Sequence, residues 1–261
     1  MTLFLHELKQ SKISVAIWTL AITFFMVTCV VIYPEMSAEM EQVGDVFASM
    51  GSFTAAFGMD QLNFGTFMGY YSIECGNVIG LGGAFFAALA GISIIAKEEK
   101  EHTAEFLLAH PIGRTYVLNA KLGAAIAQIV ILNLVVFAGT AASIVAMDIE
   151  CEWDVVMLLH LAYFIMQIEI GMICFGLSAF IRRGGLGLGL GIALVLYFMN
   201  LVKNILEEAE FLKYITPFAY TDGAQITEDV ALDWMLVVLG LVYGIIVTVI
   251  GYMKYCKKDI A

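Results

Sequence analysis

A single carboxylate inside a long apolar segment is the first feature of the sequence that could do chemistry. Glu169 lies near the middle of residues 155–181, two positions after Gln167 and nine after His160. A carboxylate at membrane depth is costly unless it is protonated, paired or facing a water-filled cavity. Two interpretations stay open: Glu169 contacts a substrate or cation on a transport path, or it makes an interhelical hydrogen bond that fixes packing.

The residue groups that enzymes need do not occur at the required spacing. His6 and Glu7 are followed by Leu8, so they do not begin an H-E-x-x-H motif, and no G-x-S-x-G motif is present. The G-x-x-x-x-G-K-[ST] pattern that cradles nucleotide phosphates is also missing. We therefore assign no catalytic, metal-binding or cofactor-binding residue, and we expect no nucleic-acid partner. An intramembrane hydrolase is the weakest of the functional alternatives.

A second distinctive group of residues lies in the segment 97–121, between two apolar blocks. A charged stretch runs into a short apolar run, Phe106 to Leu108, and Pro111 then ends the predicted helix. A short helix with an apolar face ringed by charges suits docking into a groove on a partner protein. It suits equally well a position on the bilayer surface.

The elements that must position these residues are membrane helices. The chain is 61% apolar and only 14% charged, against about a quarter charged in an ordinary soluble domain. Crossing a hydrocarbon core takes roughly 20 apolar residues in a helix. Six blocks approach or exceed that length, so the sequence predicts an all-α integral membrane protein with a single transmembrane domain and spans at about 13–33, 75–96, 122–147, 155–181, 184–202 and 234–253.

The basic residues predict the orientation of these spans. Eleven of the 13 lysines and arginines lie in residues 1–12, 97–121, 182–183 and the segment after 253. By the positive-inside rule, both termini are then cytoplasmic. Residues 34–74, 148–154 and 203–233 become the outer loops, and short interfacial helices are expected at 1–12 and within 203–214.

Small residues and cysteines give weaker indications. Gly187 and Gly191, four residues apart in the fifth block, permit close helix approach. The second block carries a similar stripe of glycines and alanine. Cys75 and Cys151 both fall near the predicted outer boundary, so a disulfide between them is one option, which spacing alone does not decide.

The segment 97–121 resembles the cytoplasmic loop of the permease subunits of type-2 ABC (ATP-binding-cassette) transporters. That loop commonly reads Glu, then Gly-Thr-x-Glu-x-Leu-Leu, two residues, Pro-Ile/Val-Ser/Thr-Arg, and a Lys seven residues after the Arg. Two positions depart from the pattern, because His102 replaces the usual Gly and Gly113 the usual Ser or Thr. The matching residues are Glu99, Thr103, Glu105, Leu107, Leu108, Pro111, Ile112, Arg114 and Lys121.

The resemblance covers essentially the whole chain and implies a function. It implies a permease subunit of an ATP-driven exporter, which pairs with an identical or related second half and is embedded in membrane lipid, in the cell membrane of a bacterium. ATP and Mg²⁺ would be bound by separate cytoplasmic ATP-binding subunits. The loop is then a coupling helix, whose Phe106, Leu107 and Leu108 fill a groove on the ATPase and whose Glu99, Glu105 and Arg114 orient it through charge pairs.

Within such a family the second and fifth spans are expected near the seam between the two halves. The substrate is not indicated by any residue of the sequence. An ATP-independent secondary transporter that uses Glu169 is the alternative function, although such proteins usually carry several buried ionisable groups and spans interrupted by proline.

Overall fold

The structure is a computed structural model that describes residues 2–49, 51–57, 61–63, 65–100, 113–181 and 185–257. Within these ranges it contains helices and no strand. Six helical segments are long and apolar enough to cross a membrane. The elements in chain order are α1 (Thr2–Ser49), α2 (Ser52–Ala56), α3 (Phe67–Glu74), η1 (Cys75–Gly82), α4 (Gly83–Lys100), α6 (Arg114–Ala146), α7 (Trp153–Ser178), α8 (Leu186–Ile205), η2 (Glu207–Tyr214), η3 (Pro217–Thr221), α9 (Gly223–Asp229) and α10 (Trp234–Lys257).

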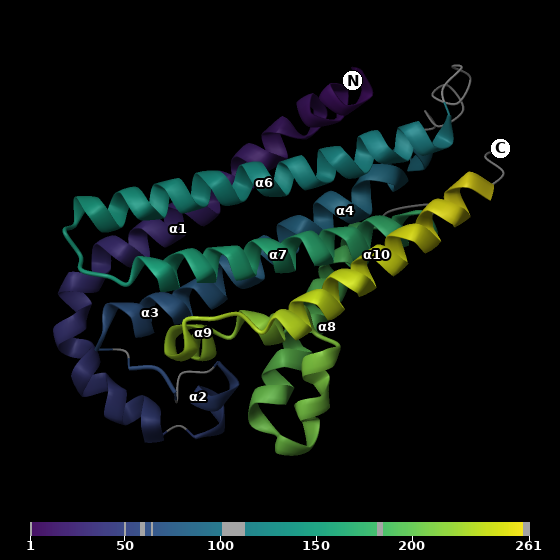
Figure 1. Ribbon diagram of the computed structural model, residues 1–261. Coiled ribbons are helices and arrows are strands. Elements are labelled where there is room, and N and C mark those ends of the chain that lie inside the picture. The colour runs from purple at the N-terminus through teal and green to yellow at the C-terminus, as the bar shows by residue number, and fades with distance from the viewer. Residues whose placement is uncertain are drawn as a thin grey trace.

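The six predicted spans correspond to six long helical segments, but two of these segments extend well past the predicted ends. Helix α1 is continuous over 48 residues, so it joins the predicted interfacial helix, the first span and part of the loop 34–74. Pro34 lies inside it, and α1 turns beneath the bundle in Figure 1. Helix α6 begins at Arg114, inside the predicted loop, because the apolar side chains of Val117 and Leu118 are fully buried there.

The second span is built from three consecutive segments rather than one regular helix. Helix α3 leads into η1, a π-helix, and α4 completes the span. A π-helical turn contains an extra residue, which changes the direction in which its carbonyls point. One carbonyl of η1, that of Ile79, accepts a hydrogen bond from the side chain of Gln167 on α7.

Helix α7 lies at the centre of the bundle, packed between α4 and α10 (Figure 1). Glycines allow the close approach on both sides. A Cβ on Gly91 of α4 would collide with the backbone of Gly171 on α7, and a Cβ on Gly251 of α10 would collide with Gly176. The glycine stripe of the second span therefore packs inside the chain.

Helix α8 has the opposite environment, although it is also rich in glycine. Only 11% of its most apolar 18-residue stretch is buried, against 67% of the corresponding stretch of the second span. Gly185 and Gly189 pack against Ile92 of α4, whereas Gly187 and Gly191 face open space. The face of α8 that carries the predicted close-approach pair is thus not covered by the described part of this chain.

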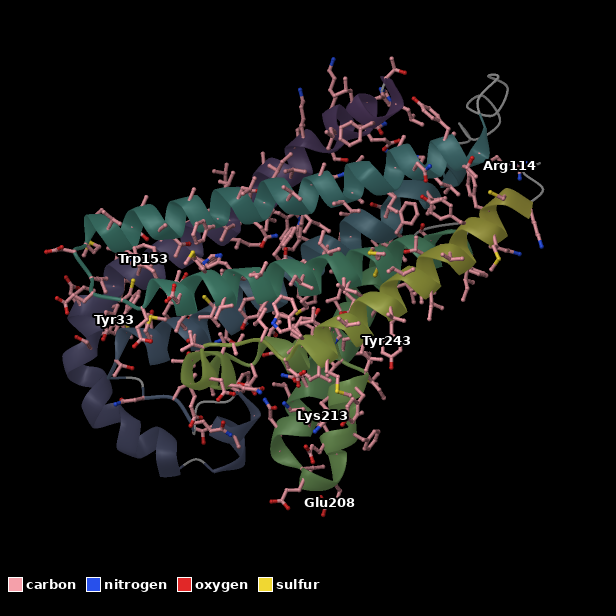
Figure 2. The ribbon with its side chains drawn as sticks, in the orientation of Figure 1. Tyr33, Arg114, Trp153, Glu208, Lys213 and Tyr243 are labelled. Carbon is pink, nitrogen blue, oxygen red and sulfur yellow. The ribbon has the colours of Figure 1, made fainter. Side chains whose placement is uncertain are left out.

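The two ends of the bundle are formed by different parts of the chain. Both chain termini lie at one end, here named the termini end, where α4 ends and α6 begins (Figure 1). The part of the molecule away from these termini includes the segment 206–233, here named the cap, which contains η2, η3 and α9 (Figure 1). Figure 2 shows Arg114 at the termini end and Glu208 and Lys213 in the cap. All five residues of η3 are buried, so this part of the cap enters the bundle.

Candidate functional site

Most of the predicted coupling helix lies outside the described residues. This applies to Thr103, Glu105, Phe106, Leu107, Leu108 and Pro111. Glu99 belongs to the backbone of α4, but its side chain is not described. The structure therefore describes the two helices that flank the loop, α4 before it and α6 after it, together with Arg114 at the start of α6.

A buried ion-pair cluster, here named the clamp, joins the N-terminal helix to both flanking helices. The carboxylate of Glu7 on α1 accepts from Lys121 Nζ of α6 at 2.8 Å and also pairs with Lys97 of α4. Lys121 donates a further hydrogen bond to the Ile94 carbonyl of α4 at 2.8 Å, and Lys97 donates to Gln10 of α1 at 2.5 Å. Three helices that are distant in sequence are thereby held at one point.

Burial makes the clamp a unit in which each charge depends on the others. The Lys121 side chain has no exposure, that of Glu7 is 2% exposed, and that of Lys97 is 21% exposed. Removing one member of a buried ion pair leaves an uncompensated charge in a poorly solvated place, which costs about 3–5 kcal/mol. The clamp therefore ties the ends of α4 and α6 to α1 at this end of the bundle.

Arg114 performs a role that sequence reasoning did not assign to it. Its Nη1 donates to the carbonyls of Tyr255 at 3.1 Å and Cys256 at 3.0 Å, at the C-terminus of α10. A cation at that position satisfies carbonyls that have no partner within the helix and interacts favourably with the helix dipole. Tyr252 of α10 also donates to Asn119 of α6 at 2.9 Å. The beginning of α6 is therefore attached to the end of α10.

Sequence analysis missed the role of Glu7, although it identified Lys121 as a matching position. The sequence predicts an interfacial helix at residues 1–12 and shows that Glu7 is not part of a metalloprotease motif, but it assigns Glu7 no role. The only signal was a pair of complementary facts: one acidic residue in the N-terminal segment and a lysine at the edge of an apolar span. Nothing in the spacing shows that the two residues meet.

Glu169 and the two polar residues noted near it, His160 and Gln167, are not brought together. His160 Nε2 is 2.7 Å from the Tyr71 hydroxyl, whereas Gln167 accepts from Asn133 of α6 at 2.7 Å. Glu169 lies on a different face of α7, because two residues along an α-helix correspond to a rotation of about 200°. Each of the three side chains consequently joins α7 to a different part of the molecule.

Glu169 itself is buried and hydrogen-bonded. The Tyr220 hydroxyl of η3 donates to Glu169 Oε2 at 2.9 Å, and Glu169 is 1% exposed. Gly240 of α10 leaves the space that this carboxylate occupies, because a Cβ there would overlap it. These contacts support the packing interpretation of Glu169, in which it fixes the cap and α10 to α7.

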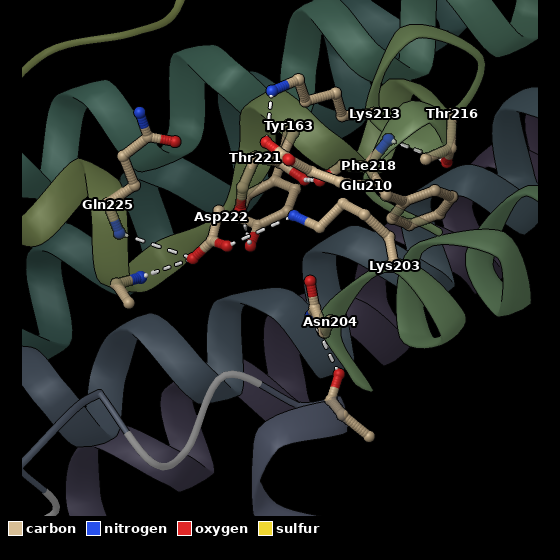
Figure 3. Close-up of polar contacts among 12 residues, drawn as sticks. Tyr163, Lys203, Asn204, Glu210, Lys213, Thr216, Phe218, Thr221, Asp222 and Gln225 are labelled. Atoms are coloured by element: carbon tan, nitrogen blue, oxygen red, sulfur yellow. Dashed lines mark hydrogen bonds and ion pairs between the residues drawn. The ribbon is translucent and has the colours of Figure 1, made fainter. Parts of the chain in front are cut away.

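Further hydrogen bonds hold the cap to the bundle. Tyr163 of α7 donates to the Thr221 carbonyl at 3.0 Å (Figure 3). Just before the cap, Asn204 of α8 donates to the Ala56 carbonyl of α2 at 3.0 Å. Thr216 donates to the Leu196 carbonyl at 2.7 Å. A looser ion pair joins Lys203 to Asp222 at 3.8 Å. Apart from this pair and Glu169, the cap is attached through neutral groups in these contacts.

The thiols considered for a disulfide are both free. Cys75 is buried in η1, and Cys151 is partly buried in the connection between α6 and α7. The disulfide option is therefore not realised in the structure.

Comparison with protein families gives one match that extends over nearly the whole chain. The model described as ABC-2 family transporter protein matches residues 1–260. The comparison with curated proteins finds no match to this chain. A match over residues 1–260 includes the clamp, both flanking helices, the cap and all six long helices.

Proposed function

This chain belongs to the ABC-2 family of transporter proteins, and from that premise we propose that it is the permease subunit of an ATP-driven exporter. As a family member with six apolar helices it is a multi-pass membrane transport protein and not itself an enzyme. The proposal adds that separate ATP-binding subunits dock on the loop 97–121 and that the protein lies in the cell membrane of a bacterium.

The clamp is the observation that carries this proposal. A docked ATPase exerts force on the loop, and that force must reach the spans. The clamp fastens both flanking helices to α1, and Arg114 fastens α6 to α10. A displacement of the loop would therefore move several helices together instead of bending one connection.

ATP and Mg²⁺ belong to the partner subunit in this proposal. The sequence has no G-x-x-x-x-G-K-[ST] motif to hold nucleotide phosphates. The residues of this chain contribute docking and force transmission: Phe106, Leu107 and Leu108 would fill a groove on the ATPase, and Glu99 and Glu105 would orient the loop. Arg114 contributes from the base of the loop by positioning α6.

A second permease half, identical or related, completes the proposed transporter. The exposed face of α8 supports this part of the proposal, since Gly187 and Gly191 leave a flat strip there that the described part of this chain does not cover. Small residues on an exposed membrane helix allow another helix to approach closely. The second span is already packed against α7, so we place the seam on α8 and its neighbours and not on α4.

The proposed orientation places the termini end in the cytoplasm and is tested by thiol labelling. Cys256 is exposed at the termini end, and Glu208 is exposed in the cap. With Cys151 replaced by serine, we expect a membrane-impermeant maleimide on intact cells to label Glu208→Cys protein but not the parent. Labelling of the parent at Cys256 without permeabilisation would reverse the orientation.

Co-purification tests the partner. Protein solubilised from its native membrane is compared with a Leu107→Asp, Leu108→Asp variant, and Phe211→Asp serves as the matched control because Phe211 is exposed at the opposite end. We expect an ATPase to co-purify with the wild type and with Phe211→Asp but not with the loop variant. If no ATPase accompanies any of the three, the ATP-driven mechanism is wrong, and secondary transport through Glu169 becomes the function to test.

A further inference from the structure

A small cavity lies between the cap and the helices on which the cap rests. Its volume is about 60 Å³, which leaves room for a few heavy atoms, because one water needs at least roughly 10–15 Å³. It is lined by residues of α2, α3, η1, α7, α8, η3 and α9. Figure 3 shows five of the lining residues, which are Tyr163, Asn204, Phe218, Thr221 and Asp222.

Three polar side chains of this lining have hydrogen-bonding capacity that the described part of the chain does not use. The Oδ1 atom of Asn200 is buried and has no hydrogen-bond partner there. The Asn77 amide and the Tyr197 hydroxyl also line the cavity without a hydrogen bond to a described residue. A buried acceptor that stays unpaired costs free energy, so we expect a hydrogen-bond donor to occupy the cavity beside Asn200.

Two helices bring these groups to the same space. Tyr197, Asn200 and Asn204 of α8 are spaced by three and four positions, so they share one face of that helix. Asn77 belongs to η1, the π-helical part of the second span, and π-helical turns frequently occur at functional sites. The polar face of α8 and the irregular turn of the second span therefore line one cavity.

The charge in the lining is already paired, so the cavity favours an uncharged ligand. Among the described residues that line it, Asp222 is the only Asp, Glu, Lys or Arg. Its Oδ1 accepts from the backbone N–H groups of Ala224 at 3.0 Å and Gln225 at 3.4 Å, and its Oδ2 lies 3.8 Å from Lys203 Nζ. A charged ligand would find no free counter-charge in the described lining.

The chemistry of the unpaired groups favours a ligand with hydroxyl groups. An asparagine amide contains both donors and an acceptor, and a phenol hydroxyl donates and accepts. A ligand hydroxyl also does both through a single oxygen, so adjacent hydroxyls can satisfy this lining within a small volume. Leu201 and Phe218 supply apolar walls for the carbon atoms between the hydroxyls. Adjacent hydroxyls on a short carbon skeleton are characteristic of sugars.

We propose that this cavity binds the hydroxylated edge of a neutral sugar. One sugar hydroxyl donates to Asn200 Oδ1, and its neighbours bond to Asn77 and Tyr197. The rest of the sugar extends past Leu62 and Asn204, which line the cavity and are partly exposed. This inference does not rest on ATP-driven export, because it concerns binding to this chain without any partner subunit.

Saturation-transfer NMR tests the proposal on the full chain in phosphatidylcholine nanodiscs, which contain no sugar. The probe is methyl glucoside, and N-methylacetamide is the comparison ligand because it offers an amide instead of hydroxyls. We expect saturable binding of methyl glucoside that is about fivefold weaker in Asn200→Leu, the effect of losing one neutral hydrogen bond. Gln225→Leu is the matched control and should bind like the wild type, because Gln225 is exposed and does not line the cavity.

A second variant separates loss of binding from damage to the fold. Tyr197→Phe removes only a hydroxyl and keeps the ring that packs on Phe218, with ring centroids 5.4 Å apart. It should keep the melting temperature of the wild type and bind methyl glucoside several-fold more weakly. Tyr214→Phe is its control, because Tyr214 is exposed in the cap and lies outside the lining.

Three results would each overturn the proposal. If the wild type does not bind methyl glucoside, the cavity holds only water. Equal affinity in the wild type, Asn200→Leu and Tyr197→Phe would place the sugar elsewhere, and preferential binding of N-methylacetamide would indicate a peptide ligand. None of these results depends on ATPase co-purification.

Octyl glucoside identifies the source of the sugar once methyl glucoside binds. Equal affinity for the two glucosides assigns the sugar to a water-soluble molecule. Higher affinity for octyl glucoside that is lost in Asn200→Leu assigns it to a glycolipid. Both results support a sugar site in this cavity.

Discussion

The two ends of this molecule are held together by different chemistry. At the termini end, the clamp ties three helices through one buried carboxylate and two lysines, while Arg114 holds the end of α10. At the opposite end, the cap is attached mostly by hydrogen bonds from neutral side chains to backbone carbonyls, such as those from Tyr163 and Thr216. The first arrangement depends on charge balance, and the second is distributed over many weaker bonds.

This difference determines how much stability is lost when a single contact is removed. In the clamp, losing one partner leaves a buried charge without compensation, so the whole cluster fails as a unit. In the cap, losing one bond costs only that bond, because neutral interhelical hydrogen bonds in membrane proteins average roughly 0.6 kcal/mol. We therefore expect a substitution in the clamp to affect all three of its helices together, and a substitution in the cap to have a local effect.

The largest effect is expected from neutralising the centre of the clamp. Glu7→Gln removes the carboxylate that Lys97 and Lys121 share, so we expect a loss of about 3–5 kcal/mol of folding free energy, measured by thermal unfolding in detergent. The double variant Glu7→Gln, Lys121→Met should recover part of the loss, since the two residues are directly coupled. A melting temperature equal to that of the wild type would show that the clamp contributes no stability.

A smaller effect is expected at the helix pair that connects the two ends. Gly91→Ala forces a methyl group against the backbone of Gly171, and overpacking of this kind costs about 1–3 kcal/mol. Gly187→Ala is the matched control: it faces open space and gains helix propensity, so its stability should equal or exceed that of the wild type. Equal destabilisation by both substitutions would mean that α8 is covered in the isolated protein.

The cap should respond in a graded manner. Tyr163→Phe removes the hydrogen bond to the Thr221 carbonyl and should cost roughly 0.6 kcal/mol. Hydrogen–deuterium exchange should increase in residues 217–224 and stay unchanged at the termini end. An increase over the whole molecule would contradict the view that the cap loosens independently.

The smallest effect is expected at the exposed pair of the cap. The hydrogen bond from Lys213 lowers the pKa of the Glu210 carboxyl, so any stabilisation is present at neutral pH and is lost as the pH falls through this lowered pKa. Both side chains are exposed, and such pairs contribute little. Lys213→Gln should therefore unfold at the same temperature as the wild type at neutral and acidic pH. A melting temperature of Lys213→Gln clearly below that of the wild type at neutral pH alone would mean that this ion pair stabilises the cap.

Much of the architecture is predictable because apolar length alone specifies a membrane helix. The six spans follow from blocks of apolar residues, and the glycines of the fifth block indicate close approach. The packing partner of each side chain is not predictable from the sequence. The glycine stripe of the second span, including Gly91, packs on α7, whereas Gly187 of α8 faces outward. One helical pattern fits both environments, and only the three-dimensional arrangement separates them.

The polar contacts of the site were less predictable for the same reason. The sequence indicates that a carboxylate at the position of Glu169 is costly at membrane depth. Its partner Tyr220 lies 51 residues away in the cap, and the sequence of η3 does not indicate that this helix enters the bundle. Glu7 gave no periodic or motif signal. Arg114 and Lys121 were identified by resemblance, yet their contacts, with α10 and α1, lie within this chain.

The clamp also sets an order of assembly. Glu7 is separated by 90 residues from Lys97 and by 114 from Lys121. During synthesis, which proceeds from the N-terminus, the first span enters the membrane while its carboxylate has neither partner. Lys97 supplies the first counter-charge at the end of the second span, and Lys121 supplies the second at the start of the third. The clamp is thus complete only after the chain has been made as far as residue 121, and a chain released before residue 97 carries an unpaired Glu7 at its start.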